Sequence, residues 1–192
     1  MRSESVAAIL ISGGASSRFG CDKTQVIIGG TTLAVRTAVL LSLVVETAIE
    51  VGPGVSGLPC TREIPPGGGP LAAVAAGALE LQRRHHSGSA LVLACDLPLI
   101  TEQLLEFLVN WESDCSVVPE VRGRLQPLCA RWSRQDLDGA IHLVNNGVRS
   151  LRHLSNQNNV VRLCESDWKQ VAHEDQFVDI DYQEDLRELG IT

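Results

Sequence analysis

Two short apolar runs constrain the fold more than any other feature of the sequence. Residues 6–11 and 90–95 are continuously apolar, and a small or polar turn follows each run. Runs of this kind are typical of parallel strands that are covered on both faces. Between them, the pair Thr31-Thr32 can cap a helix to about residue 42, residues 45–51 can return as a strand, and Pro70 can open a second helix. The chain therefore alternates strand, helix, strand, helix and strand.

This alternation predicts an α/β fold of the three-layer, doubly wound type, with a mostly parallel sheet and right-handed crossovers. Ligands of such folds bind at the carboxyl ends of the strands. Thr101 can cap a further helix to about residue 110. The later segments predict strands over 116–119, 126–132 and 177–181, and helices over 133–143, 148–154 and 184–189. The sequence has 192 residues and no repeat or flexible linker, so we expect one domain over residues 1–192.

Charge and hydropathy exclude several classes of protein. Sixteen Lys and Arg against 23 Asp and Glu give a formal charge of −7. This balance argues against a nucleic-acid partner, because such binding depends on basic patches. No apolar run reaches the roughly 18 to 20 residues that a membrane span needs. The first residues also lack the pattern of a secretory signal, so we expect a cytoplasmic protein without a membrane partner.

The cysteines do not suggest a metal site or a disulfide framework. They show no C-x-x-C pair, and most lie in apolar runs. We therefore expect reduced core residues at all six positions, which are 21, 60, 95, 115, 129 and 164.

The loop after the first strand is suited to a polyphosphate. Gly13 and Gly14 let the backbone approach a ligand and aim consecutive N–H groups at it. Arg18 offers a bidentate fork, and Lys23 offers a mobile positive charge. The loop lacks the G-x-G-x-x-G spacing of dinucleotide-binding folds, and Asp22 stands where a Walker A loop needs glycine. The alternative is that the glycines only turn the chain and the two cations are surface charges.

The spacing of this loop resembles the signature L-x-G-G-x-x-x-R-x-G-x-x-K of nucleotidyltransferases, in particular the molybdenum cofactor guanylyltransferase family. The matching residues are Leu10, Gly13, Gly14, Arg18, Gly20 and Lys23. Residues 65–73 resemble the Gly-Pro-Leu-Ala segment of the same family, in which a glycine-rich loop enters a helix beside the base and sugar. The resemblance implies a nucleotide site formed by Leu10, Ser12, Gly13, Gly14, Lys23, Gly69, Pro70 and Asp96.

Asp96 is the first candidate metal ligand. It follows the strand over residues 90–94, and a carboxylate at that place can hold Mg²⁺ together with phosphate oxygens and water. A helix-capping role for Asp96 is the alternative, but Thr101 already serves that purpose. The resemblance also assigns the ion to this aspartate. For a second acid we choose Asp181 over Asp179, since it lies nearer the end of the expected strand, although Thr-Pro of the family is replaced here by Tyr182 and Gln183.

Arg149 and Arg152 are candidates for binding the acceptor. They lie three residues apart on the helix expected over 148–154, so both can face one phosphate. The alternative is a solvated stripe of charge. The histidines show no metal-type spacing, and we assign them no role.

Taken together, the resemblance implies transfer of GMP from GTP to the phosphate of a molybdopterin-type acceptor, with release of pyrophosphate. Arg18 and Lys23 would stabilise charge on the triphosphate, and Asp96 would be catalytic through Mg²⁺. The resemblance also suggests transient contact with cofactor-handling proteins. The alternatives are transfer of CMP, a sugar-phosphate or phospho-acid acceptor, or a non-catalytic nucleotide-binding module. A dehydrogenase is disfavoured, because no acid follows the second strand to bind a ribose.

Overall fold

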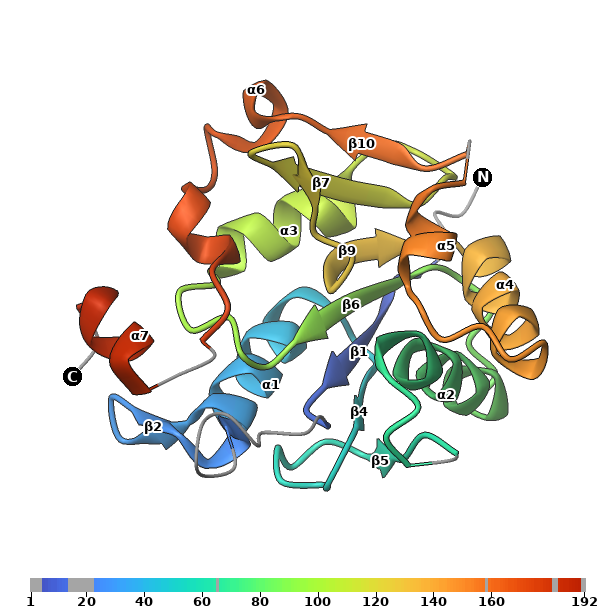
Figure 1. The fold of residues 1–192 in the computed structure, drawn as a ribbon, viewed down its shortest axis with the longest axis horizontal. Coiled ribbons are helices and arrows are strands. Elements are labelled where there is room, and N and C mark those ends of the chain that lie inside the picture. The colour runs from blue at the N-terminus through green and yellow to red at the C-terminus, as the bar shows by residue number, and fades with distance from the viewer. Residues whose placement is uncertain (1–4, 14–22, 65, 158, 181–182, 191–192) are drawn as a thin grey trace.

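The sheet is the centre of the molecule (Figure 1). The computed structural model describes residues 5–13, 23–64, 66–157, 159–180 and 183–190, without the side chains of residues 23 and 183. Within these residues an eight-stranded sheet forms. Its strands, in order across the sheet, are β10 (Val161–Leu163), β7 (Val117–Val121), β9 (Cys129–Trp132), β6 (Ala90–Ala94), β1 (Ala7–Ile11), β4 (Ala48–Val51) and β5 (Cys60–Thr61), while β8 (Arg124–Leu125) pairs with β7.

The sheet is mostly parallel, as the sequence predicts. Strands β6, β1, β4 and β5 run parallel to one another, and β10 runs parallel to β7. Strand β9 is antiparallel to both of its neighbours, β6 and β7. The predicted fold class is therefore confirmed, with one reversed strand between the two parallel parts.

Helices cover both faces of the sheet (Figure 1). On one face, α1 (Leu33–Val44) and α3 (Glu102–Asn110) pack against Leu10, and on the other α2 (Pro70–Arg83) and α4 (Arg134–Asn145) pack against Ile9. Full burial of such a side chain stabilises the fold by about 1.5–3 kcal/mol. The remaining elements are η1 (Lys23–Gln25), β2 (Ile27–Ile28), β3 (Thr31–Thr32), α5 (Arg152–Ser155), α6 (Glu165–Trp168), η2 (Glu174–Phe177) and α7 (Gln183–Glu188).

The predicted helix starts agree with the structure. The side chains of Thr32, Thr101 and Ser133 accept hydrogen bonds from the backbone N–H groups three residues further on. Pro70 occupies the first turn of α2. The first N–H groups of a helix have no partner within the helix. The three hydroxyl groups accept a hydrogen bond from one such N–H each, and Pro70 has no N–H that needs a partner.

The strand predicted over residues 177–181 is wrong. The 3₁₀-helix η2 ends at Phe177, and no ladder of the sheet includes residues 177–180. Phe177 packs against Trp168 with ring centroids 5.2 Å apart, whereas Ile180 packs against Leu33. The backbone N–H of Ile180 donates instead to the carbonyl of Asp96 in the loop after β6, so the segment packs along the end of the sheet without joining it.

The helix predicted over residues 148–154 is also wrong in its extent. Helix α4 ends in a turn at Gly147, where φ is 79° and the N–H of Val148 donates to the carbonyl of Leu143. The next helix, α5, begins only at Arg152. Arg149 therefore lies in the preceding loop and does not share a helix with Arg152.

The expectation that the cysteines are core residues holds for two of them. Cys95 and Cys129 are buried, and burial raises the pKa of the Cys129 thiol to about 12. Cys60 and Cys164 are exposed, so the expectation is wrong there. Cys115 is partly exposed, and Cys21 lies outside the described residues.

Within the part of the chain that the structure describes, no helix combines the length and the apolar character that crossing a membrane requires.

Candidate active site

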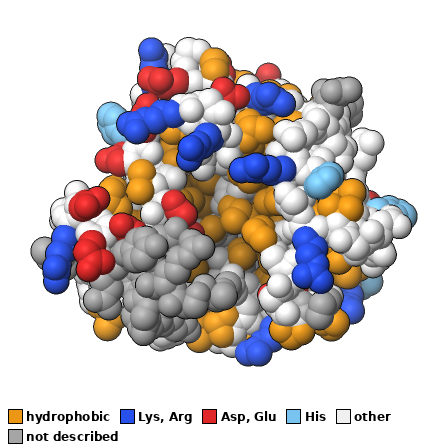
Figure 2. All heavy atoms as spheres, viewed as in Figure 1, with side chains coloured by type: hydrophobic (Ala, Val, Ile, Leu, Met, Phe, Trp, Pro, Cys, Tyr) orange, Lys and Arg blue, Asp and Glu red, His pale blue; other side chains and the backbone are white. Residues whose placement is uncertain are grey.

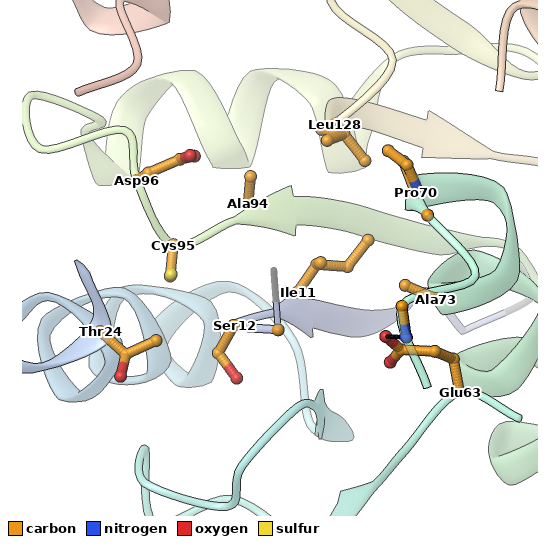
Figure 3. Close-up of a pocket in the computed structure, with 13 residues that line it drawn as sticks. Ile11, Ser12, Thr24, Glu63, Pro70, Ala73, Ala94, Cys95, Asp96 and Leu128 are labelled. Atoms are coloured by element: carbon orange, nitrogen blue, oxygen red, sulfur yellow. Dashed lines mark hydrogen bonds between the residues drawn. The ribbon is translucent and has the colours of Figure 1, made fainter. Parts of the chain in front are cut away.

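A pocket of about 360 Å³ opens at the carboxyl ends of β1 and β6. Figure 3 shows Asp96 and Glu63 at opposite ends of this pocket, with Ile11 and Ser12 between them. The space-filling view shows a hollow with apolar side chains inside it and several Lys or Arg side chains along one part of its rim (Figure 2). The pocket is lined by Ile11, Ser12, Gly13, Thr24, Glu63, Gly67, Gly69, Pro70, Ala73, Ala94, Cys95, Asp96 and Leu128.

The start of the first loop is held against strand β4. The backbone N–H groups of Ser12 and Gly13 both donate to the carbonyl oxygen of Val51, at 3.1 and 3.2 Å. These two donors fasten the loop to the sheet, so any cradle of N–H groups for a phosphate would have to come from later in the loop. Gly14, Arg18 and the side chain of Lys23 lie outside the described residues.

The N-terminus of α2 faces the pocket. Gly69, Pro70 and Ala73 line the cavity, and Gly69 is the N-cap with φ 87° and ψ −178°, a conformation open to glycine but not to other residues. The cap has no side-chain hydrogen bond. The partial positive charge of a helix start is therefore directed at the pocket, which favours an anionic ligand.

Asp96 brings a carboxylate to the end of strand β6. It lines the pocket and is partly buried. Its backbone carbonyl accepts a hydrogen bond of 3.0 Å from the N–H of Ile180, which places Ile180 and the preceding Asp179 beside this strand end. Asp179 is exposed, and Asp181 lies outside the described residues.

The donor atoms at this end of the pocket fit Mg²⁺. That ion prefers oxygen ligands and keeps several waters, so one or two carboxylates are sufficient to hold it. Asp96 could supply one, and the bond from Ile180 to its backbone brings the adjacent residue Asp179 into the same neighbourhood. Among the residues that the structure describes, no cluster of three or more His, Cys, Asp or Glu is found.

Several predicted residues do not line the pocket. Leu10 is buried in the core on the side of α1, so its side chain does not reach the cavity. Arg149 and Arg152 are exposed and lie outside the lining. The carbonyl oxygen of Arg149 is nevertheless 3.7 Å from the point where a Cβ on Gly69 would lie, so this loop borders the mouth of the pocket.

Glu63 is a charged pocket residue that the sequence analysis missed. Its carboxylate lines the cavity and accepts a hydrogen bond of 3.2 Å from the N–H of Gly67. An acid shortly before a glycine-rich loop was the available signal, but the position of the loop relative to β1 could not be known from spacing. The structure places a second carboxylate at the pocket end away from Asp96 (Figure 3).

The position of this pocket, at the carboxyl ends of parallel strands and the start of a helix, is typical of α/β proteins that bind nucleotides. The chain belongs to the family of MobA-like NTP transferase domains, whose family model matches residues 8–161. It is therefore a nucleotidyltransferase, and the resemblance of its first loop is confirmed.

Individual relatives agree with this assignment. The chain is 29% identical over 191 residues to a protein named probable molybdenum cofactor guanylyltransferase from Bacillus cereus, covering 93% of this chain and 92% of the relative. The fold matches molybdopterin-guanine dinucleotide biosynthesis protein A from Archaeoglobus fulgidus with a TM-score of 0.77 and 22% identity, covering 95% and 96% of the two chains. It also matches Rv0371c from Mycobacterium tuberculosis in complex with manganese, with a TM-score of 0.60 and 14% identity, covering 87% and 97%.

Proposed function

We propose that this chain, acting as one domain, transfers GMP from GTP to the phosphate of a molybdopterin-type acceptor and releases pyrophosphate. The observation that carries the proposal is the single pocket that unites the end of β1, the start of α2 and the carboxylate of Asp96. The family of the chain and the name of its Bacillus relative support the same reaction. What is proposed beyond the family is that the nucleotide is GTP, that the acceptor is of the molybdopterin type, and that the residues named below have the stated roles.

Glu63 supports guanine as the base. A carboxylate only accepts hydrogen bonds, and its two oxygens suit two neighbouring donors. Guanine presents N1–H and N2–H₂ side by side, whereas cytosine and adenine present a single amino group beside acceptor atoms. Glu63 lies at the opposite end of the pocket from Asp96, so the base can face one carboxylate while the phosphates face the other end (Figure 3).

The phosphates require neutralising groups, because the protein itself is acidic. Arg18 and Lys23 are proposed to contact the triphosphate, whereas the start of α2 lies at the Glu63 end of the pocket, beside the proposed place of the base and sugar (Figure 3). Asp96, together with Asp181 or Asp179, would hold Mg²⁺. When bound there, the ion would neutralise charge on the phosphoryl oxygens.

The acceptor phosphate is already ionised at neutral pH, so the reaction needs no strong base in the protein. Catalysis would then come from holding the two substrates in line and from neutralising charge. We propose that Arg149 and Arg152 bind the acceptor phosphate. The loop carrying Arg149 borders Gly69 at the mouth of the pocket, which supports this role.

A binding titration tests the choice of nucleotide. GTP, CTP, ATP and UTP are titrated into the full chain with and without Mg²⁺, and the Kd of each is measured. We expect the tightest binding for GTP with Mg²⁺, and we expect Glu63→Ala to remove most of the preference over CTP. A wild-type preference for another nucleotide would overturn the guanylyl assignment.

A second experiment tests the acceptor. We expect pyrophosphate release from GTP when molybdopterin is present and none from GTP alone.

A further inference from the structure

Glu50 is a buried carboxylate at a position where the sheet otherwise holds apolar side chains. It lies on β4, and none of its surface is exposed. Across the sheet Glu50 lies opposite Leu10 on β1 and Cys60 on β5, and Leu10 in turn lies opposite Leu93 on β6. Packing alone would be satisfied by another leucine or valine in this row. A charge at such a position is expensive unless it is fully hydrogen-bonded, so its contacts are informative.

The carboxylate of Glu50 accepts hydrogen bonds from two loops. Oε1 accepts from the Ser12 hydroxyl at 2.5 Å and from the N–H groups of Gly54 and Val55 at 2.8 and 3.2 Å. Oε2 accepts from the N–H and the hydroxyl of Ser56 at 2.9 and 2.5 Å. Four residues on two separate segments therefore meet at one side chain.

These bonds keep Glu50 ionised. Burial acts to raise its pKa, but the hydrogen bonds from Ser12, Ser56 and Gly54 act in the other direction and hold the pKa below its ordinary value of 4.5. An ionised carboxylate is an acceptor only, which matches a set of partners that are all donors.

The hydrogen bond between Ser12 and Glu50 lies where the first loop leaves β1. Ser12 lines the pocket, and its neighbour Gly13 follows in the same wall. Gly52 packs so closely here that a Cβ on it would lie 2.1 Å from the Ser12 Oγ. The backbone of Ser12 is tied to Val51, and its side chain is tied to Glu50, so both fix the direction in which the loop continues.

We propose that Glu50 is a positioning residue for nucleotide binding, which acts by holding the pocket residue Ser12 against residues 54–56, which lie outside the pocket lining. The proposal rests on the nucleotide site described under the proposed function. It does not depend on which nucleotide is bound. Because Glu50 does not itself line the cavity and acts before chemistry, it should affect the affinity for the nucleoside triphosphate far more than turnover at saturation.

Two serines provide a matched test. Ser12→Ala and Ser56→Ala each remove one hydroxyl hydrogen bond of 2.5 Å to Glu50, but only Ser12 lines the pocket. We expect similar decreases in the thermal unfolding midpoint from both. We expect Ser12→Ala to raise the Kd of GTP with Mg²⁺ about tenfold, and Ser56→Ala to change it less than twofold. Equal changes in Kd, or no change in Ser12→Ala, would overturn the proposal.

A double-mutant cycle separates positioning from direct contact. Glu50→Gln keeps the shape of the side chain but places an amide NH₂ against a donor. If Ser12 binds the nucleotide through the position that Glu50 gives it, Glu50→Gln should also raise Kd about tenfold, and the double variant should be little worse than either single variant. Additive effects would show independent roles and overturn the proposal. Should Glu50→Gln fail to fold, Glu50→Asp, which keeps the charge but shortens the side chain, takes its place in the cycle and is judged by the same two outcomes.

The outcome also distinguishes this inference from the proposed function. All titrations are repeated with the nucleoside triphosphate that the wild-type chain binds best. If that nucleotide is CTP, the guanylyl assignment fails while the role of Glu50 is judged on CTP in the same way. If the wild-type chain binds none of the four nucleotides, both proposals are overturned.

Discussion

The two parts of the sheet are built differently. Strands β1, β4, β5 and β6 are parallel, and their loops are fastened by buried bonds such as those of Glu50 and of the Val51 carbonyl. Strands β7, β8, β9 and β10 mix parallel and antiparallel pairs, and the elements after α4 are short. The first part surrounds the proposed nucleotide pocket, and the second carries the proposed acceptor residues.

This difference bears on how each part would bind its proposed ligand. The proposed nucleotide part is formed by backbone groups and buried side chains, so its geometry is fixed by packing. In the proposed acceptor part the arginines are exposed, and the ion pair between the exposed Arg122 and the partly exposed Glu174 lies at the surface. Exposed pairs stabilise little and are screened by salt. Substitutions in the first part should therefore have larger effects than matched substitutions in the second.

The largest effect is expected at Asp96. Asp96→Asn removes the charge at the end of β6, and we expect turnover with saturating Mg²⁺ to fall by about 10²-fold or more, as loss of an electrostatic stabiliser commonly does. Lys23→Ala should lower turnover by a factor of the same order. Steady-state pyrophosphate release measures the turnover of both variants, and circular dichroism checks that they fold. Asp175→Asn is the control in the other part, because Asp175 is exposed and outside the pocket lining. Activity of Asp96→Asn within a few-fold of wild type would refute the catalytic assignment.

The same substitution in two packed helices should have opposite signs. A Cβ on Gly77 of α2 would lie 2.6 Å from Cγ2 of the buried Ile9, so Gly77→Ala should lower the free energy of unfolding by about 1–3 kcal/mol. A Cβ on Gly139 of α4 would meet only Leu154 Cδ1 at 3.7 Å. Gly139→Ala should therefore raise stability by about 0.5–1 kcal/mol through helix propensity. Urea unfolding measures both. Equal changes would contradict the tighter packing of α2 on β1.

The same contrast explains what could be predicted from the sequence. Residues 6–110 follow regular rules: continuous apolar strands, Thr32 and Thr101 as caps, and Pro70 at a helix start. The later region depends on contacts that leave no local pattern, such as Phe177 against Trp168 in a neighbouring turn and Ile180 against Leu33 far away in the chain. In the pocket, Asp96 and the glycines were predictable from motifs. Glu50 and Glu63 were not, since their roles depend on which loops the fold brings together.

Glycines with positive φ give a second matched pair. Gly69 has φ 87° at the mouth of the pocket, and Gly147 has φ 79° at the end of α4, with no atom close to its missing Cβ. Alanine at either position should introduce backbone strain of about 1–3 kcal/mol. Gly69→Ala should also raise the Kd of GTP about tenfold, since it displaces the start of α2. Calorimetric titration measures Kd, and a similar change in Gly147→Ala would mean that strain alone, wherever it lies, weakens binding.

The smallest effects are expected for the acceptor arginines, because they are exposed. Arg149→Ala and Arg152→Ala should each raise the KM for the acceptor about three- to tenfold and leave the Kd of GTP unchanged. Raising the ionic strength should reduce the difference from wild type, since screening weakens the same contact in the unmodified chain. Arg162→Ala, on the edge strand β10, removes an equally exposed charge and serves as control. If Arg162→Ala raised the KM as much, net charge and not a defined site would account for acceptor binding.

A change in the Kd of GTP in Arg149→Ala alone would have a different meaning. It would show that the loop carrying Arg149 acts on the nucleotide pocket through its contact with Gly69, so this loop would belong to the nucleotide part of the molecule.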